Sequence, residues 1–278
     1  DQPRSRGLGD VYKRQGEKST KFFLRLIKQH QATKTMEKIR NSEGNLVSSP
    51  IEILEAGQMY YKELYKKVES DLLDETFFDK CPTIDRDIKH KLDSPITLEE
   101  FRSTLKSCRD SAPGLDGIPY SYYKVFGDIL IPRILDSWNY SLTFGSLAPS
   151  HRQACISLLP KTGKDLTELK NWRPISLTAC DLKVITKTIS NRLKPALQEC
   201  IFANQAAYVP GRDINFNNRL LLIAKRYAEK YKKDYCSVSL DAQKAFDSVS
   251  HQYLRRVLRE YGFSETFVDM FNTIYNRQ

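Results

Sequence analysis

Apolar residues recur every three or four positions along most of the chain, and this spacing predicts amphipathic helices. One of these helices begins with a capping box, in which Thr97 is the N-cap and Glu100 lies three residues later. Another is expected to be interrupted near Gly127 and Pro132, because both residues disfavour a helix interior. The expected helices are residues 18–31, 50–67, 97–108, 120–141, 181–200, 217–232, 245–261 and 264–276.

Shorter stretches of alternating or β-branched residues predict strands. Polar residues around Gly163 separate two of these stretches and predict a hairpin. The pattern as a whole predicts an α+β chain that is mostly helical and has short antiparallel strands. The expected strands are a small hairpin within residues 36–47, a larger hairpin of 154–159 and 172–177, and a single strand at 235–240.

The charge pattern favours a polyanionic partner. The chain carries 44 Lys and Arg against 34 Asp and Glu, a net charge of +10. The basic excess lies in residues 1–67 and 111–278, and the segment between them is acidic. Nucleic acid is the simplest partner for such a chain, although a basic protein without one would have the same composition.

The composition also argues against several other classes of protein. No run approaches 18 apolar residues, so no membrane span is predicted, and no signal peptide opens the chain. The six cysteines form no CxxC pair and have no zinc spacing with the four histidines. This scatter predicts free, reduced thiols in an intracellular protein.

The first feature that carries chemistry is Asp241, at the end of the expected strand 235–240 and just before a helix. A carboxylate there is held at a rigid edge with exposed oxygens, as a hard divalent cation requires. Phe246 follows five residues later and can return beside the same pocket. The alternative is that Asp241 or Asp247 only caps the following helix.

The second feature is a pair of cations, Lys161 and Arg173, that flank the expected hairpin. A hairpin can fold such a pair over a triphosphate, with Lys as a point charge and Arg as a bidentate fork. Pro160 and Pro174 stiffen the neighbouring backbone. The alternative is a solvated basic hairpin without a ligand.

Taken in order along the chain, these features resemble the reverse transcriptases of non-LTR (LINE-type) retrotransposons. The resemblance covers nearly the whole chain after about residue 16, and five segments in the family's order carry it. Residues 16–23 resemble the segment before the polymerase, 112–119 a motif at the start of the fingers, 159–177 the fingers segment with the nucleotide-binding Lys and Arg, 204–212 the next block, and 240–249 polymerase motif A.

The resemblance implies right-hand polymerase fingers and a partial palm, preceded by a helical linker region. The expected division is a tail or read-through scar at residues 1–15, an N-terminal linker region at 16–95, fingers at 96–234 and the first part of the palm at 235–278. The resemblance also implies an RNA template, a DNA primer and deoxynucleoside triphosphates as partners. Insertion into chromosomes by the family implies access to the nucleus.

The resemblance further implies roles for individual residues. Asp241 would bind the two catalytic Mg²⁺ ions, helped by the backbone carbonyl of Ala242. Phe246 would be the steric gate, a ring that packs under the sugar of the incoming nucleotide and rejects a 2′-hydroxyl. Lys161 and Arg173 would hold the triphosphate. Near template and nucleotide the resemblance places Gln205, Gly211 and Arg212, and in structural roles Pro113, Gly114, Asp116, Gly117 and Asp247.

One departure from the family bears on activity. The family's motif C presents two adjacent carboxylates after motif A, and this chain contains no Asp-Asp pair. A lone carboxylate binds Mg²⁺ weakly, because the number of carboxylates sets much of the affinity. The chain is therefore expected to be a fragment that is inactive on its own. A non-catalytic RNA-binding fragment and a decayed open reading frame are the alternatives.

Overall fold

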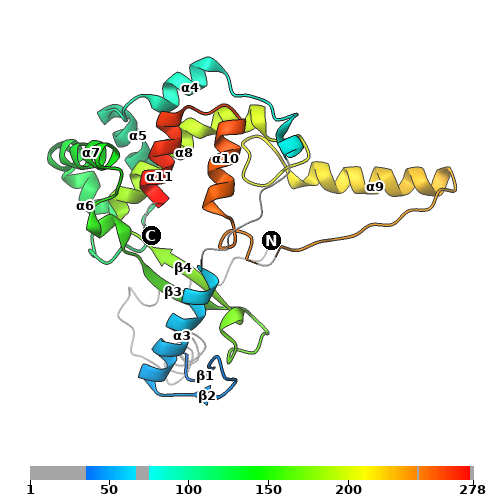
Figure 1. Ribbon diagram of the computed structural model, residues 1–278, viewed down its shortest axis with the longest axis horizontal. Coiled ribbons are helices and arrows are strands. Elements are labelled where there is room, and N and C mark those ends of the chain that lie inside the picture. The colour runs from blue at the N-terminus through cyan, green and yellow to red at the C-terminus, as the bar shows by residue number, and fades with distance from the viewer. Residues whose placement is uncertain (1–35, 67–74, 243, 276–278) are drawn as a thin grey trace, which may run out of the picture. The chain divides into compact units, whose positions relative to one another are not determined.

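The computed structural model describes residues 36–66, 75–242 and 244–275, so the expected helix 18–31 lies outside the described residues. The chain divides into two units. Unit 1 contains the residues up to Glu63 together with Leu158–Ile175, and unit 2 contains Leu64–Ser157 and the residues from Ser176 onward. The described residues are mostly helical with short antiparallel strands, as predicted (Figure 1).

The described part of unit 1 contains two hairpins and one helix. Strands β1 (Ile39–Arg40) and β2 (Leu46–Val47) pair antiparallel, and α3 (Pro50–Leu64) follows with Pro50 as its first residue. These bounds confirm the expected small hairpin and the start of the helix at Pro50. The backbone N–H of Arg40 donates to the carbonyl of Thr167 (2.8 Å), which ties this hairpin to the loop of the larger one.

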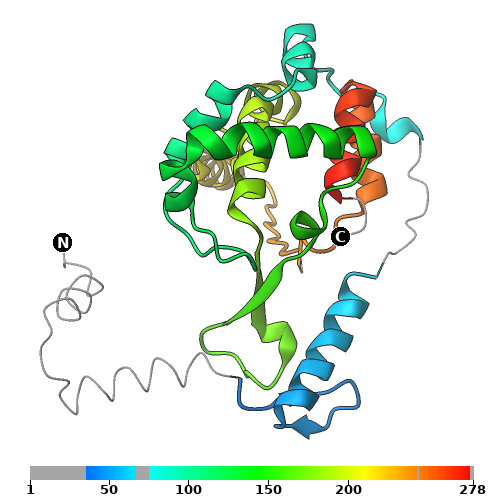
Figure 2. The same cartoon turned by 90° about the vertical axis from the view of Figure 1, so that its left-hand side faces the viewer.

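The larger hairpin is formed by β3 (Cys155–Pro160) and β4 (Trp172–Leu177), as predicted. The two strands run side by side as a ribbon (Figure 2). Trp172 is buried, and its indole N–H donates to the carbonyl of Leu166 (2.9 Å). This bond anchors the loop to the beginning of β4, because a buried indole N–H needs an acceptor.

The core of unit 2 forms around helix α8 (Cys180–Cys200). Its apolar stripe is buried against three helices that the chain supplies earlier. Those helices are α4 (Arg86–Asp93), α5 (Leu98–Ser107) and α6 (Tyr120–Val125). Burial of large apolar side chains contributes about 1.5–3 kcal/mol each, which makes this packing the main stabilisation of the unit.

Four further helices complete unit 2. The expected break near Gly127 is observed, because α6 ends and α7 (Gly127–Phe144) begins there, whereas Pro132 lies inside α7. Helix α11 (Glu265–Tyr275) packs on α7 and α4, and α10 (His251–Glu260) packs on α11. Helix α9 (Ile214–Lys230) buries only Ala228.

Polar side chains connect these helices at defined points. Thr97 and Glu100 form the predicted capping box at the start of α5. Glu100 also accepts a 3.0 Å hydrogen bond from Arg192 of α8, and the guanidinium donates to the carbonyls of Ser94 and Pro95. This buried arginine is therefore paired on all sides, as a buried charge must be.

The expected strand 235–240 is wrong for this structure. Residues 233–242 have no regular secondary structure, and Val238 and Leu240 are 72% and 90% exposed. A strand is stabilised by hydrogen bonds to a neighbouring strand, and none of the described strands pairs with this segment. The next helix also starts later than expected, at His251, because Ser250 caps it by accepting a bond from the N–H of Tyr253.

Two absences were predicted from the composition. All six cysteines are free thiols. Among the described residues, no helix combines the length and the apolar character that crossing a bilayer requires.

The loop at residues 112–119 packs against the start of α8. A Cβ on Gly114 would lie 2.6 Å from the backbone nitrogen of Ala179 and 2.7 Å from the carbonyl carbon of Thr178. Asp116 accepts a bond from the N–H of Ile118, and Gly117 has a φ of +69° that favours glycine. The conformation therefore explains both glycines of the loop.

We predict that Gly114→Ala lowers the free energy of unfolding by about 1–3 kcal/mol, because the backbone of α8 has to move away from the new methyl group. Urea denaturation measures this change. Gly57→Ala is the matched control, since no atom lies within 4 Å of a Cβ there and α3 gains a better helix former. Equal stability of Gly114→Ala and wild type would contradict the observed packing.

Candidate functional site

The two predicted cations lie at the end of the β3–β4 ribbon, in unit 1. The N–H of Lys161 donates to the carbonyl of Asn171 (2.9 Å), which extends the ladder by one pair. In this register Arg173 stands opposite Leu159, so Lys161 and Arg173 are diagonal neighbours on one face of the ribbon. The structure therefore brings the two predicted cations together.

The two cations differ in their own contacts. The ammonium of Lys161 donates to the carbonyl of Lys170 (2.8 Å), which holds the side chain over the loop. Arg173 is exposed, and within the described part of the chain its guanidinium makes no hydrogen bond or ion pair. Its five N–H donors are thus available to an anion that approaches this face.

The loop between the strands has a defined conformation. Gly163 has a φ of +72°, and Asp165 accepts bonds from both the backbone N–H and the hydroxyl of Thr167. These bonds to Thr167 hold the pKa of Asp165 below its ordinary value, so the loop carries one fixed negative charge close to the cations. The cations are therefore presented by an ordered turn.

Asp241 lies in unit 2 and is exposed, as is Ala242. Neither residue belongs to a helix or strand, so the rigid strand end expected for Asp241 is absent. No group of three or more His, Cys, Asp or Glu side chains in the described ranges could hold a metal ion. The described residues alone therefore do not make a complete Mg²⁺ site around Asp241.

Residues 244–248 form a turn after Asp241. The N–H of Asp247 donates to the carbonyl of Lys244 (3.0 Å), and its carboxylate accepts a 3.3 Å bond from the hydroxyl of Tyr65. Burial, together with the Asp247 charge, raises the pKa of Tyr65, so the phenol keeps its proton and acts as the donor. Asp247 therefore joins this turn to Tyr65, and its expected structural role stays a prediction.

Phe246 projects from this turn and meets an aromatic ring from a distant segment. Its ring lies edge-to-face with that of Tyr208, with centroids 5.9 Å apart and planes at 87°. Both rings are largely exposed, at 80% for Phe246 and 85% for Tyr208. The structure thus places the expected steric gate beside the 204–212 block.

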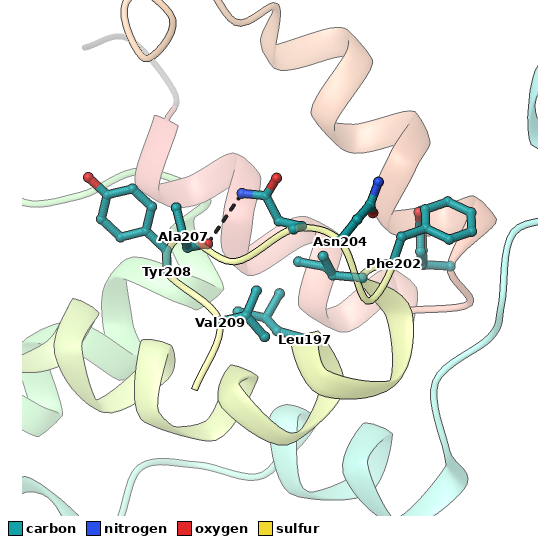
Figure 3. Close-up of a pocket in the computed structure, with 9 residues that line it drawn as sticks. Leu197, Phe202, Asn204, Ala207, Tyr208 and Val209 are labelled. Atoms are coloured by element: carbon teal, nitrogen blue, oxygen red, sulfur yellow. Dashed lines mark hydrogen bonds between the residues drawn. The ribbon is translucent and has the colours of Figure 1, made fainter. Parts of the chain in front are cut away.

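The loop that contains Tyr208 borders an apolar pocket of 490 Å³ (Figure 3). The side-chain amide of Gln205 donates to the carbonyl of Ala207 (3.3 Å). Tyr208 and Gly211 both have positive φ values, of 62° and 75°. The pocket is lined by Leu197, Ile201, Phe202, Asn204, Gln205, Ala207, Tyr208, Val209 and Tyr261.

Arg212 has a structural role that the sequence reasoning missed. Its guanidinium donates to the carbonyls of Ile201 (2.6 Å) and Gln205 (3.0 Å), and also to those of Gln198 and Phe202. These acceptors lie at and beyond the C-terminus of α8, where helix carbonyls lack intrahelical partners. Basic side chains near a helix C-terminus can donate to its last carbonyls, but Arg212 comes twelve residues after α8 ends at Cys200, too far for a local signal in the sequence.

Comparisons with known proteins identify the family of one segment of the chain. Residues 159–278 match the family model described as reverse transcriptase (RNA-dependent DNA polymerase). These residues belong to the reverse transcriptase family. The match begins at Leu159, so it takes in both hairpin cations as well as Asp241 and Phe246.

Several proteins of transposable elements are similar to this chain. The chain is 34% identical over 262 residues to the transposon TX1 uncharacterized 149 kDa protein of Xenopus laevis, over 93% of this chain and 20% of that protein. It is 30% identical over 171 residues to the retrovirus-related Pol polyprotein from type-1 retrotransposable element R2 of Popillia japonica, over 62% of this chain and 23% of that protein. A third relative, the polyprotein from element R2DM of Drosophila melanogaster, is 30% identical over 183 residues, 66% of this chain and 17% of that protein.

This chain thus spans about a fifth of the length of these relatives. The resemblance to reverse transcriptases of retrotransposons is confirmed by the family match together with these relatives from transposable elements. The roles of the individual site residues and the expected domain boundaries stay predictions. The hairpin cations lie in unit 1, whereas Asp241 and Phe246 lie in unit 2.

We predict that Arg212→Lys lowers the free energy of unfolding by about 1 kcal/mol, because one ammonium group cannot serve four carbonyls in the fork geometry of arginine. Thermal denaturation compares it with Arg219→Lys, a control in the exposed part of α9. If both substitutions had the same effect, the carbonyl contacts of Arg212 would contribute nothing to stability.

Proposed function

We propose that this chain supplies the fingers and the first part of the palm of an RNA-directed DNA polymerase of a non-LTR retrotransposon. The observation that carries the proposal is the pair Lys161 and Arg173 on one face of an ordered hairpin, inside the segment that matches reverse transcriptases. The substrates are deoxynucleoside triphosphates, added to a DNA primer along an RNA template. The reaction is attack of the primer 3′-hydroxyl on the α-phosphate, with release of pyrophosphate.

The two cations bind and orient the triphosphate in this proposal. Arg173 contributes a bidentate fork to phosphate oxygens, and Lys161 a point charge from the opposite strand. Phosphoryl transfer needs little covalent chemistry from the protein, because positioning and charge supply most of the rate enhancement. The pair therefore acts on the negative charge that develops on the leaving pyrophosphate.

Reverse transcriptases in general use divalent metal ions, which neutralise phosphate charge and lower the pKa of the attacking hydroxyl. Asp241 is the proposed metal ligand of this chain, with the carbonyl of Ala242 beside it. The described residues contain no group of three such ligands, so this proposal takes the remaining carboxylates for two Mg²⁺ ions from outside the described residues. We therefore expect the 278-residue chain alone not to polymerise nucleotides.

Phe246 is the proposed steric gate. A rigid ring under the sugar leaves no room for a 2′-hydroxyl, so it discriminates by exclusion rather than by a hydrogen bond. The edge-to-face contact with Tyr208 supports this role, because it restricts where the Phe246 ring can move. Gln205, Gly211 and Arg212 then belong to a loop that borders the nucleotide site.

The proposed metal ligand is tested in a longer polypeptide that contains this chain and extends an RNA-templated primer. Asp241→Asn is expected to reduce nucleotide incorporation at least about a hundredfold, because the amide cannot replace a charged ligand. Asp234→Asn is the matched control, since Asp234 is also exposed and lies seven residues earlier. Undiminished incorporation by Asp241→Asn would refute the proposed role of Asp241.

The gate is tested by sugar selectivity in the same polypeptide. Phe246→Val is expected to lower the preference for deoxynucleotides over ribonucleotides by about tenfold or more, measured as the ratio of kcat/KM values. Phe216→Val in α9 removes an exposed ring of the same kind and should leave the ratio unchanged. A ratio that Phe246→Val does not alter would exclude Phe246 as the gate.

A further inference from the structure

A buried pair of polar side chains joins the two chain segments from which the β3–β4 ribbon extends. Nε2 of His151 lies 3.0 Å from Oδ2 of Asp181, and the two side chains are only 8% and 17% exposed. His151 stands four residues before β3 and Asp181 four residues after β4. The pair therefore closes the base of the ribbon in unit 2. His151 and Asp181 stand opposite each other in the same register as the residue pairs of the β3–β4 ladder.

Asp181 is held in place from several directions. Its other carboxylate oxygen accepts a 2.7 Å bond from the N–H of Leu182, in the first turn of α8. Burial raises the pKa of Asp181, but the hydrogen bond and charge of His151 and the bond from Leu182 outweigh burial and hold the pKa below its ordinary value. Asp181 is thus ionised, and its carboxylate accepts a hydrogen bond from the imidazole of His151.

The loop at residues 112–119 also packs against the start of α8, close to Asp181 in the sequence. Gly114 packs directly on the backbone of Thr178 and Ala179, and the ammonium of Lys183 donates to the carbonyl of Ala112 (2.9 Å). The chain that returns from β4 into α8 is therefore held by a backbone contact on one side. Beyond the end of the ladder, the His151 imidazole links this part of the chain to the segment that leads into β3.

Such a link matters because a two-stranded ribbon is marginally stable on its own. β3 and β4 have six residues each, which corresponds to about 20 Å of strand between the base and the cations. A slip in register at the base carries along the ladder and changes which residue of β4 stands opposite Lys161, and a misplacement of about 1 Å can reduce a reaction rate about a hundredfold. A single polar pair at the base can therefore control the position of Lys161 and Arg173.

We propose that His151 and Asp181 are positioning residues, which lock the base of the β3–β4 ribbon and hold Lys161 and Arg173 in the arrangement that binds the triphosphate. The claim that the pair holds Lys161 and Arg173 for triphosphate binding rests on the proposed function. The claim that the pair locks the base concerns the ribbon alone. A buried, geometrically specific pair suits such a role, because an apolar pair of similar size would pack without defining one arrangement.

The test uses the 278-residue chain and two readouts. Hydrogen exchange of the amides in Cys155–Pro160 and Trp172–Leu177 reports on the ribbon, and calorimetric titration with Mg²⁺ and dATP reports on triphosphate binding. His151→Leu removes the donor, whereas His151→Gln keeps an N–H that can reach Asp181. His90→Gln is the matched control, because His90 is exposed on α4 of the same unit.

His151→Leu is expected to speed exchange in the ribbon about tenfold and to weaken dATP binding about tenfold. His151→Gln should recover most of both losses, and His90→Gln should behave as wild type. A purely structural role would change global stability without this rescue of binding. If His151→Leu does not fold, Asp181→Asn carries the test, with a clear loss in both readouts expected for Asp181→Asn and only a small loss for His151→Gln.

The outcomes separate the two proposals. Unchanged ribbon exchange in folded His151→Leu and Asp181→Asn overturns the lock, whatever happens to binding. Faster exchange with unchanged dATP binding overturns the positioning of the cations. If wild-type chain binds no dATP while Lys161→Ala behaves identically, the proposed function fails, and ribbon exchange still decides whether the pair locks the base.

Discussion

Helix α8 has to be buried along its length, and most of unit 2 follows from that constraint. Its side chains at Cys180, Ile185 and Ala196 are fully buried, and α4, α5 and α6 cover them. The charged side chain of Arg192, on the buried face, is matched by Glu100 and by two backbone carbonyls. Because β4 leads directly into α8, the burial of this helix also determines where the hairpin ribbon returns to the core.

Local sequence signals predicted the elements whose partners lie close in the chain. The capping box at Thr97, the β3–β4 hairpin with Lys161 and Arg173, and the apolar stripe of α8 all formed as expected. Each of these depends on spacing or capping within about twenty residues. The same signals identified the reverse transcriptase family, because its motifs occur in order along the chain.

The features that sequence missed depend on contacts between distant residues. The alternation at residues 235–240 predicts a strand, but an isolated strand leaves its backbone groups without partners, and the described chain offers no strand to pair with it. His151 and Asp181 are thirty residues apart, and nothing in either local segment indicates that they meet. The contact of Tyr208 with Phe246 is of the same kind, since a positive φ at a tyrosine has no sequence signal.

In the proposed function, the ribbon binds the triphosphate, and the segment around Asp241 and Phe246 contacts the metal and the sugar. These groups lie in different units, so their joint action in one site depends on where a nucleotide binds. The ribbon is the part whose geometry is defined, through its register, its loop and its base.

The most direct test is a chemical map of the triphosphate. A dATP analogue with an acyl group on its terminal phosphate transfers that group to lysines within reach, and mass spectrometry identifies them. We predict that Lys161 is acylated first and that excess dATP protects Lys161 from acylation. Acylation spread over the lysines of α9, with Lys161 unlabelled or unprotected, would contradict a triphosphate site on the hairpin.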